Sequence, residues 1–279
     1  MSFLTSNTGA DSILPAEFAA LITDPVTAES VAFHPDVATT ITTGSHEFHI
    51  PVLREDAGAE WVPEGGEITP DDPTLDEVTV TPAKVAGLTI VSRELAADST
   101  PDAQNIVGAS LARAIITQVD RAFLGALPAP APRGLGSIDP QYLLAEGDNV
   151  HDALISAVSV AETNGSVVSA FLVNPSDANK LALFKDAANS NRPLLADARV
   201  IMGRPVIVNK HVPEGTIWAV DKTKIFSVLR EGTTLAISDG PFFTSDRVAI
   251  RATLRIGFGF PQPLGLVRIT QDPSDVTTP

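Results

Sequence analysis

The feature that most limits how this chain can fold is the uneven distribution of its charge. Residues 1–82 contain 15 of the 34 acidic residues, one of the 19 bases (Arg54) and eight of the 22 prolines. A stretch this acidic and Pro-rich, with few bulky apolar side chains, is poorly equipped to build a core of its own. It is either disordered or ordered by packing on something else, and strand-like patterns within it favour packing.

Composition excludes several classes of protein. The net charge of −15 argues against a dedicated nucleic-acid-binding site, which needs clustered Lys and Arg. The 44% hydrophobic content and 19% charged content of the 279 residues predict a folded chain. There is no apolar run of roughly 18 residues and no signal-peptide pattern at the start, so we expect a soluble, non-exported protein without membrane contact. The absence of Cys excludes disulfides, thiolate nucleophiles and Cys-based metal sites.

Two segments of the acidic stretch predict a long hairpin. Residues 47–54 and 75–82 alternate apolar and polar side chains as strands do. The residues between them are dense in Gly, Pro and acid, which is typical of a loop. Because an isolated hairpin is marginally stable in water, this excursion needs a surface to lie on.

The remainder of the chain predicts an α+β body. The clearest element is a helix at 101–124, with Thr100 as its cap, Pro101 at its first position and a length of roughly 35 Å. It follows a strand at 85–91 and a short helical segment around 93–97. Further helices are predicted at 151–163 and from 174 to about 185, and further strands at 168–173, 200–202, 205–209, 216–220, 225–229, 233–238, 246–258 and 264–269.

No motif predicts catalysis, a cofactor or a metal. His46 and His49 have an odd spacing that puts them on opposite faces of a strand, so a surface role is favoured over metal binding. The acidic pairs in the hairpin lack the oxygen spacing of a calcium loop, and GFGF at 257–260 lies within a strand with no helix after it. We therefore expect no enzyme activity.

One polar pattern remains. Arg247, Arg251 and Arg255 fall on one face of the strand at 246–258. They form either a solvated face or a basic face over which the acidic loop of another copy lies, since guanidinium groups pair well with carboxylates. The inter-subunit contacts predicted on the second interpretation are Arg247, Arg251, Arg255, Glu60, Trp61, Glu64, Glu67, Asp71 and Asp72.

Several segments, taken in order along the chain, resemble those of a known family. These segments are GAEWVPEGGEITPDDPTLDEVTVTPAKVAGLTIVSRELAADS at 58–99, QVDRAFLGA at 118–126, PRGLGS at 132–137, FLVNPSDANKLALFKDA at 171–187, MGRPVIVN at 202–209 and PQPLGLVRI at 261–269. In this order and spacing, they resemble the tailed-bacteriophage major capsid proteins of the Hong Kong ninety-seven fold. The resemblance covers about residues 43–270.

The resemblance implies an α+β phage capsid fold divided into an arm, a loop and two domains. Residues 1–42 would be an N-terminal arm and 43–82 an extended β-hairpin loop lying on a neighbouring subunit. Residues 83–139 and 241–279 would form a peripheral domain with a spine helix at 101–124. Residues 140–240 would form an axial domain with a mixed sheet and flanking helices.

The resemblance also implies a function. The chain would be a major capsid protein that self-assembles into pentamers and hexamers of an icosahedral shell, located in the virion and made in the bacterial host cytoplasm. Its partners would be itself, a portal, scaffolding or decoration proteins, and double-stranded DNA held non-specifically. The alternative is an encapsulin, a bacterial shell of the same fold with enzyme cargo, although residues 1–18 are short and polar where encapsulins carry a helical cargo-binding segment. A hydrolase with an unrecognised site is disfavoured, because the sequence contains no catalytic motif.

Two departures from the family pattern qualify these expectations. Some members form covalent crosslinks between a loop Lys and a neighbour's Asn, but the first Lys here is Lys84, so residues 43–82 offer none. Some members also carry a long helical scaffolding segment before the arm. None is found here, so scaffolding would come from another protein, be unnecessary or have been cleaved away.

Overall fold

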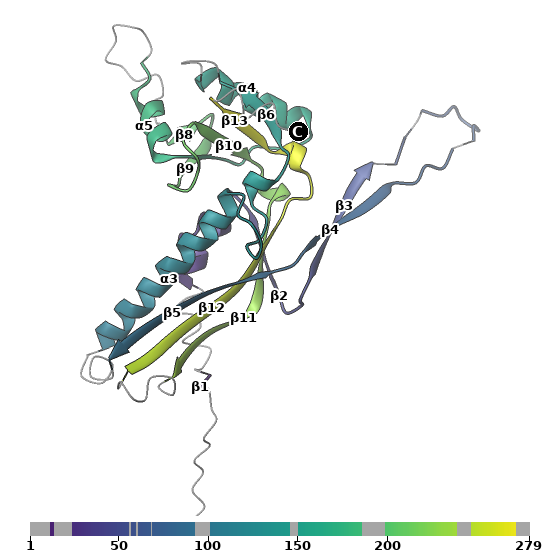
Figure 1. The fold of residues 1–279 in the computed structure, drawn as a ribbon. Helices are drawn as coiled ribbons and strands as arrows, with labels where there is room; N and C mark the ends of the chain where they lie inside the picture. The colour runs from purple at the N-terminus through teal and green to yellow at the C-terminus, as the bar shows by residue number, and fades with distance from the viewer. Residues whose placement is uncertain are drawn as a thin grey trace, which may run out of the picture.

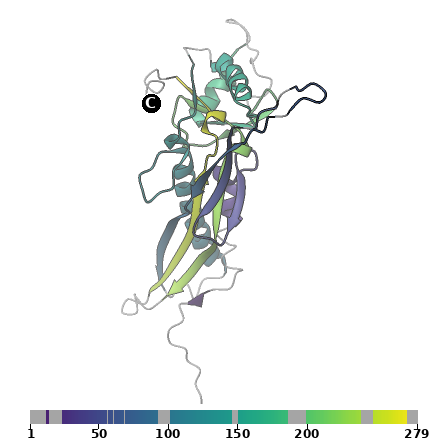
Figure 2. The ribbon, with the colours of Figure 1, turned by 90° about the vertical axis from the view of Figure 1, so that its right-hand side faces the viewer.

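The computed structural model describes residues 12–13, 24–55, 57–59, 61–67, 69–92, 101–145, 150–185, 199–238 and 247–271. Within them the chain has an α+β architecture of three parts: a long twisted sheet backed by one long helix, a second body of sheet and helices, and a two-stranded hairpin (Figure 1). Seen from the side, the long sheet forms one half of an elongated body and the second sheet the other (Figure 2).

The long sheet has the strand order β1-β11-β12-β5, and β2 pairs in parallel with β11. Its strands are β1 (Ser12–Ile13), β2 (Thr39–Thr43), β5 (Ala83–Ser92), β11 (Phe226–Ser238) and β12 (Arg247–Gly259). The β5, β11 and β12 ladders are antiparallel, and β5 is an edge of the sheet.

One face of the long sheet is covered by α3 (Pro101–Leu124), whose bounds confirm the predicted spine helix. Leu111, Ile115 and Val119 are spaced by four residues, so they share a stripe that packs in one core with Leu254 and Ile256 of β12. Apolar burial therefore holds the helix along the sheet. The cap at Thr100 and the helical segment at 93–97 lie outside the described residues.

The second body contains a six-stranded mixed sheet in the order β6-β13-β10-β7-β9-β8, with two helices. Its elements are β6 (Gln141–Leu144), α4 (Val150–Thr163), β7 (Ala170–Val173), α5 (Pro175–Leu183), β8 (Val200–Ile201), β9 (Arg204–Val208), β10 (Thr216–Val220) and β13 (Val267–Thr270). Asn174 caps α5 by accepting a hydrogen bond from the Ser176 N–H, with Pro175 at the first helical position. Phe171, Leu154 and Ile269 belong to its separate core.

The strands are divided between the two sheets differently from the domain boundaries expected from the sequence. The boundary expected at residue 240 separates β11 from β12, which pair antiparallel from Phe226↔Gly259 to Ser238↔Ala249. Conversely, β13 lies in the six-stranded sheet beside β10 and β6, although residues 241–279 were expected with the spine helix. The two strands predicted at 225–229 and 233–238 are one strand, with an irregularity between Arg230 and Thr234.

The N-terminal segment is anchored rather than detached over residues 24–43. Residues 24–29 are helical, and the 3-10 turn η1 (Val31–Phe33) follows. Val26, Val31 and Phe33 are buried in the core that holds α3, and Figure 1 shows this purple segment against the helix. Shorter 3-10 turns are η2 (Leu135–Ser137), η3 (Lys222–Lys224) and η5 (Pro263–Gly265).

Candidate inter-subunit surfaces

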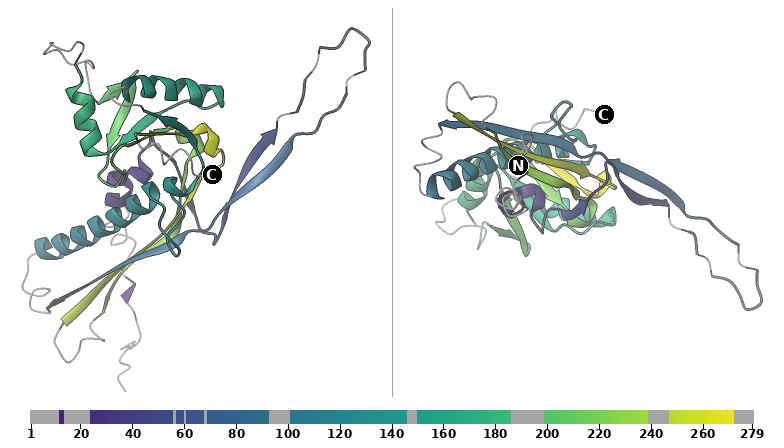
Figure 3. Two further views of the ribbon diagram at one scale, coloured as in Figure 1. Left: turned by 45° about the horizontal axis from the view of Figure 1, so that its top comes forward. Right: turned by 90° about the horizontal axis from the view of Figure 1, so that it is seen from below.

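The hairpin predicted from sequence alternation is confirmed. β3 (Phe48–Glu55) and β4 (Thr74–Val80) pair antiparallel, with an irregularity between Leu53 and Glu55. Figures 1 and 3 show the hairpin projecting away from the two sheets and from α3. Most of its surface therefore has no contact with the body of its own chain.

An ion pair stiffens the exposed part of the hairpin. Arg54 Nη2 lies 2.7 Å from Asp76 Oδ2 across the two strands. The hydrogen bond from Arg54 holds the pKa of the Asp76 carboxyl below its usual value, helped by the Glu77 backbone N–H. Because both groups are exposed, the pair contributes little to the stability of the fold.

The tip of the hairpin gathers the predicted acidic residues and a bare tryptophan. Glu64, Glu67 and Asp72 are exposed and form no ion pair with any described residue. Asp71 is also exposed, and its Oδ2 accepts a hydrogen bond from the Gly58 N–H at 2.7 Å. Trp61 is fully exposed, at 105% of its reference area. Glu60, the remaining predicted contact here, lies outside the described residues.

The root of the hairpin packs on the long sheet through two glycines. A Cβ at Gly257 would lie 2.6 Å from Val80 Cγ1, and one at Gly259 would lie 2.5 Å from Ile50 Cδ1. Ile50 and Val80 are buried together with Val228 of β11. The GFGF motif, which suggested no function in the sequence, is thus the place where the hairpin lies directly on the sheet backbone.

The arginine face predicted on β12 exists, on the face of the long sheet away from α3. Arg247 and Arg251 are exposed and Arg255 is half-buried, while Leu254 and Ile256 on the other face are buried against the helix. None of the three arginines forms a salt bridge with a described residue. Any ionic partner that they have lies outside the described residues or on another molecule.

Two further bases, which the pattern of the strand at 246–258 does not predict, widen this face. Arg255 stands directly opposite Lys84 of β5 and Arg230 of β11. Residues opposite one another share a face, so the three cations form one row across three strands. Like charges placed directly opposite repel one another, and an anion lying over the row would relieve that repulsion. We call these five residues the basic face: Lys84, Arg230, Arg247, Arg251 and Arg255.

Among the described residues, the structure brings the predicted cations together and the predicted acids together, but it does not bring the two sets to each other. The connection between β3 and β4 points away from β12 in both views of Figure 3. A second copy could supply the missing contact, because both surfaces are present on every copy.

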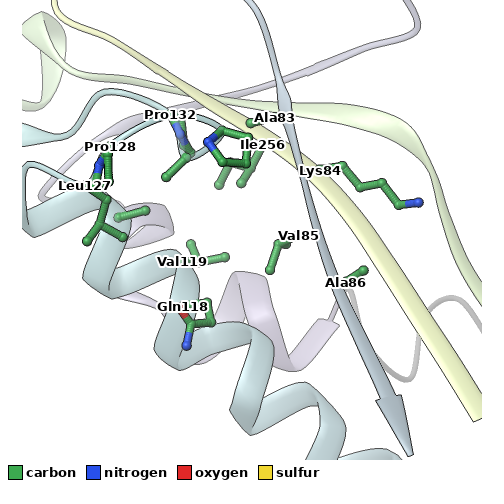
Figure 4. A pocket seen from close by; sticks show the side chains of 13 residues that line it. Ala83, Lys84, Val85, Ala86, Gln118, Val119, Leu127, Pro128, Pro132 and Ile256 are labelled. Carbon is green, nitrogen blue, oxygen red and sulfur yellow. The ribbon is translucent and has the colours of Figure 1, made fainter.

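Two open grooves border these surfaces. The first, of about 500 Å³, runs between β5 and α3 and is closed at one end by the Pro-rich loop at 127–132 (Figure 4). The second, of about 480 Å³, lies near the hairpin root, between Val78, Tyr142 and Phe260. The first is lined mainly by apolar side chains, whereas the wall of the second also contains Arg133, Ser137 and Asp139.

A buried carboxylate joins the N-terminal segment to both bodies. Asp120 of α3 accepts hydrogen bonds from the Ser30 hydroxyl at 2.6 Å, the Val31 N–H at 3.0 Å and the Asn209 amide at 2.8 Å. Beside it, burial and then the charge of Lys210 lower the pKa of His211. Because Asp120 is only 4% exposed, these three donors replace water around it.

The remaining polar side chains of the described residues form no metal site. No group of three or more His, Asp or Glu gathers there in a way that could hold a metal ion. His49 lies on the hairpin surface, 3.3 Å from Glu77 and 3.2 Å from Thr79. None of the helices in this part of the chain combines the length and hydropathy needed to cross a lipid bilayer.

Comparison with known proteins decides the family. Residues 11–270 match the sequence model of the phage capsid family. This chain belongs to the phage capsid family. The curated "Capsid polyprotein" of Pseudomonas phage PAJU2 is similar to this capsid protein, with 24% identity over 190 residues, or 62% of this chain. The chain spans only 28% of that relative's length.

Solved structures are similar over nearly the whole capsid chain. A chain from Mycobacterium phage Bobi has a TM-score of 0.70 at 19% identity, covering 87% of this chain and 90% of its own. One from Mycobacterium phage Adephagia has a TM-score of 0.69 at 18% identity, covering 96% and 99%. A chain described as the capsid of an empty GTA particle has a TM-score of 0.70 at 19% identity, covering 94% and 98%. The capsid fold predicted from the sequence is confirmed, and the family favours a phage capsid over an encapsulin.

Proposed function

We propose that this chain is a structural, non-enzymatic major capsid protein that assembles into pentamers and hexamers of an icosahedral shell around phage double-stranded DNA. The observation that carries the proposal is the hairpin: among its described residues Ile50, Val52 and Val80 are buried, and most of the others are exposed. A surface of this kind is ordered by assembly. The portal, scaffolding or decoration proteins, and non-specifically held DNA are its further partners in the virion, after synthesis in the bacterial host cytoplasm.

The three parts of the chain take separate roles in this proposal. The long sheet with α3 is the peripheral domain, the six-stranded sheet with α4 and α5 is the axial domain around the capsomer centre, and residues 43–82 are the extended loop. Residues 1–42 are the N-terminal arm, and the buried contacts of residues 26–38 tie part of it to the peripheral domain.

Contacts between copies form between the acidic hairpin and the basic face, two surfaces of opposite net charge. The acidic hairpin of one copy lies over the basic face of the next, so that Glu64, Glu67, Asp71 and Asp72 pair with Arg247, Arg251 and Arg255 across the interface; Glu60 and Trp61 complete the hairpin's contact surface. These arginines form no ion pair with any other residue that the structure describes, which supports this arrangement. Each exposed pair contributes about 1 kcal/mol or less, and a closed lattice repeats it many times.

A near-neutral body is compatible with confinement of DNA. Residues 83–279 carry 19 acidic and 18 basic residues, so the acidity of the chain belongs to its arm and loop. Closure of the shell, rather than affinity for phosphate, then retains the genome. The acidic residues of the arm and the loop then form contacts between subunits.

Assembly of the purified chain tests the proposal. Static light scattering over a range of protein and salt concentrations, with negative-stain microscopy of the products, should show closed particles or capsomer rings. A stable monomer or dimer under every condition would contradict it. For particles recovered from a phage lysate, nuclease-protected DNA supports the capsid, whereas an enzyme cargo supports the encapsulin alternative.

A further inference from the structure

Trp61 is the most exposed large apolar side chain in the described part of the molecule. It precedes a tight turn in which the Gly66 N–H bonds the Pro63 carbonyl at 2.8 Å, with Gly65 at a φ of +83°. These are the features of a type II turn, which needs a residue with positive φ at its third position. The turn gives the hairpin tip a defined shape, and a Trp presented in this way is typical of an interface anchor.

The groove between β5 and α3 offers an apolar site of suitable size. Figure 4 shows side chains from three sides around it: Val85 and Ile256 from the sheet, Val119 from the helix, and Leu127, Pro128 and Pro132 from the loop. Its volume of about 500 Å³ falls in the range of sites that bury a small ligand. An indole buries roughly 150–250 Å² on entering such a site. Gln118, exposed at the rim, provides an amide oxygen that can accept the indole N–H.

The charges beside the groove complement those beside Trp61. Lys84 leaves the groove wall and extends away from α3 in Figure 4, toward the side of the sheet that carries Arg255. Glu64 follows Trp61 by three residues, which span at most about 10 Å of chain. Lys84, Arg255 and Arg230 stand on adjacent strands about 4.8 Å apart, so their row is also about 10 Å wide. A Trp61 seated in the groove therefore brings Glu64 within reach of the cationic row.

We propose that the groove between β5 and α3 is the receiving site for Trp61 of a neighbouring copy. The indole is buried among Val85, Val119 and Pro128, and the acids after Trp61 pair with the row that begins at Lys84. The hairpin cannot reach the groove of its own chain in this structure, because it projects to the opposite side of the molecule (Figures 1 and 3). The inference rests on the proposed self-assembly and identifies where one subunit holds the next.

Tryptophan fluorescence tests the site directly, because the chain has only two tryptophans and the other, Trp218, is buried at 2% exposure. The difference between the spectra of the natural chain and Trp61→Phe isolates Trp61. We expect emission typical of a solvated indole in the dilute subunit and a clear blue shift on assembly. In Gln118→Phe, where an aromatic ring from the rim fills the groove, we expect the blue shift to be lost or the assembly yield to fall at least tenfold.

Cross-linking provides a second readout, since the chain has no Cys. Trp61→Cys combined with Gln118→Cys should give a ladder of covalent oligomers with a short bis-maleimide after assembly. The matched control combines Trp61→Cys with Ile155→Cys, an exposed position on α4 of the second body, and should give no ladder.

The outcomes separate this inference from the capsid proposal. Shells that form while Trp61 stays solvated and the 61–118 pair does not cross-link overturn the receiving site and leave the capsid proposal standing. A blue-shifted Trp61 in the dilute subunit also overturns the site, because the indole would then pack on its own chain. Failure of the natural chain to form any particle contradicts the capsid proposal itself and, with it, the site.

Discussion

A Cβ added to Gly259 would lie 2.5 Å from Cδ1 of Ile50, so the hairpin root and the sheet approach as closely as a glycine allows. Gly257, two residues earlier on the same face of β12, has the same relationship with Val80. The hairpin is thus attached at one small apolar contact, formed with Val228, while its distal part remains free. This contact sets the direction in which the hairpin leaves the body.

Gly259→Val should therefore loosen the hairpin root. The added side chain overpacks against Ile50 and Val80, which costs about 1–3 kcal/mol where neighbours cannot move. We expect faster hydrogen exchange at the root amides of β3 and β4 and a lower assembly yield. Gly108→Ala is the control, because no described atom beyond the adjacent residues and the nearby backbone of its own helix lies within 4 Å of the added Cβ. This helical change should raise the free energy of unfolding by about 0.5–1 kcal/mol. Equal exchange rates in Gly259→Val and the natural chain would contradict the attachment.

Asp120→Ala should destabilise the subunit by about 3 kcal/mol in urea unfolding. The substitution removes the common acceptor of the Ser30 hydroxyl, the Val31 N–H and the Asn209 amide, and a buried donor without a partner costs about 1–3 kcal/mol. Asp139→Ala, at an exposed carboxylate, should change stability by less than about 0.5 kcal/mol. If the two variants had similar urea midpoints, the hydrogen bonds to Asp120 would contribute nothing to the stability of the subunit.

The elements that the sequence predicted well are those whose signals are local. α3 begins at Pro101 and ends before Gly125, and both residues are helix-boundary signals that need no knowledge of the fold. The hairpin strands showed a period of two over seven or more residues. The arginine face of β12 followed from the same period.

What the sequence did not predict depends on contacts between distant segments. Lys84 and Arg230 join the basic face because β5 and β11 flank β12 in a particular register, and that register is not encoded in any one strand. Asp120 resembles a surface residue of a helix, because its donors lie about 90 residues away on either side. For the same reason the boundary at residue 240 was placed between two strands that prove to be partners. Trp61 was predicted as a contact, but its receiving groove combines three separate segments.

His211 should make stability sensitive to mildly acidic pH. Its pKa is lowered from 6.5 by burial and by Lys210, while Asp120 opposes the shift and Arg121 adds to it. Between the folded pKa and 6.5 the unfolded chain binds more protons than the folded one, so stability falls as the pH drops through this window. Urea midpoints at pH 7.5 and 5.5 should differ less in His211→Gln than in the natural chain. An identical difference in both proteins would contradict the prediction.

The shell should contain no covalent crosslinks formed by the hairpin. Residues 43–82 contain no Lys, and Lys84 is the first in the chain. Without an amine on the loop, no isopeptide bond can join it to a neighbour's Asn. Assembled particles boiled in denaturant should run as a single monomer band in gel electrophoresis. A ladder of covalent oligomers would show that the loop or another segment reacts by a different route.

Replacing Arg247, Arg251 and Arg255 by Gln should weaken assembly and make it less sensitive to salt. The natural interface pairs these cations with carboxylates at an exposed surface, where ions of the solvent screen the attraction. We expect the concentration of protein needed for assembly to rise severalfold at low salt and to change little as salt is added.

The control for this triple variant must alter net charge equally without touching the basic face. Arg113 and Arg121 on α3 and Lys210 after β9 are exposed, and their replacement by Gln changes the charge by the same three units. If net charge alone controlled assembly, the two variants would respond to salt alike. Because the acidic side chains of the hairpin are expected to pair with the basic face, and only the apolar Trp61 to enter the groove, the control should keep the salt response of the natural chain. Unchanged assembly in the Arg247, Arg251 and Arg255 variant would exclude the pairing and favour a solvated face.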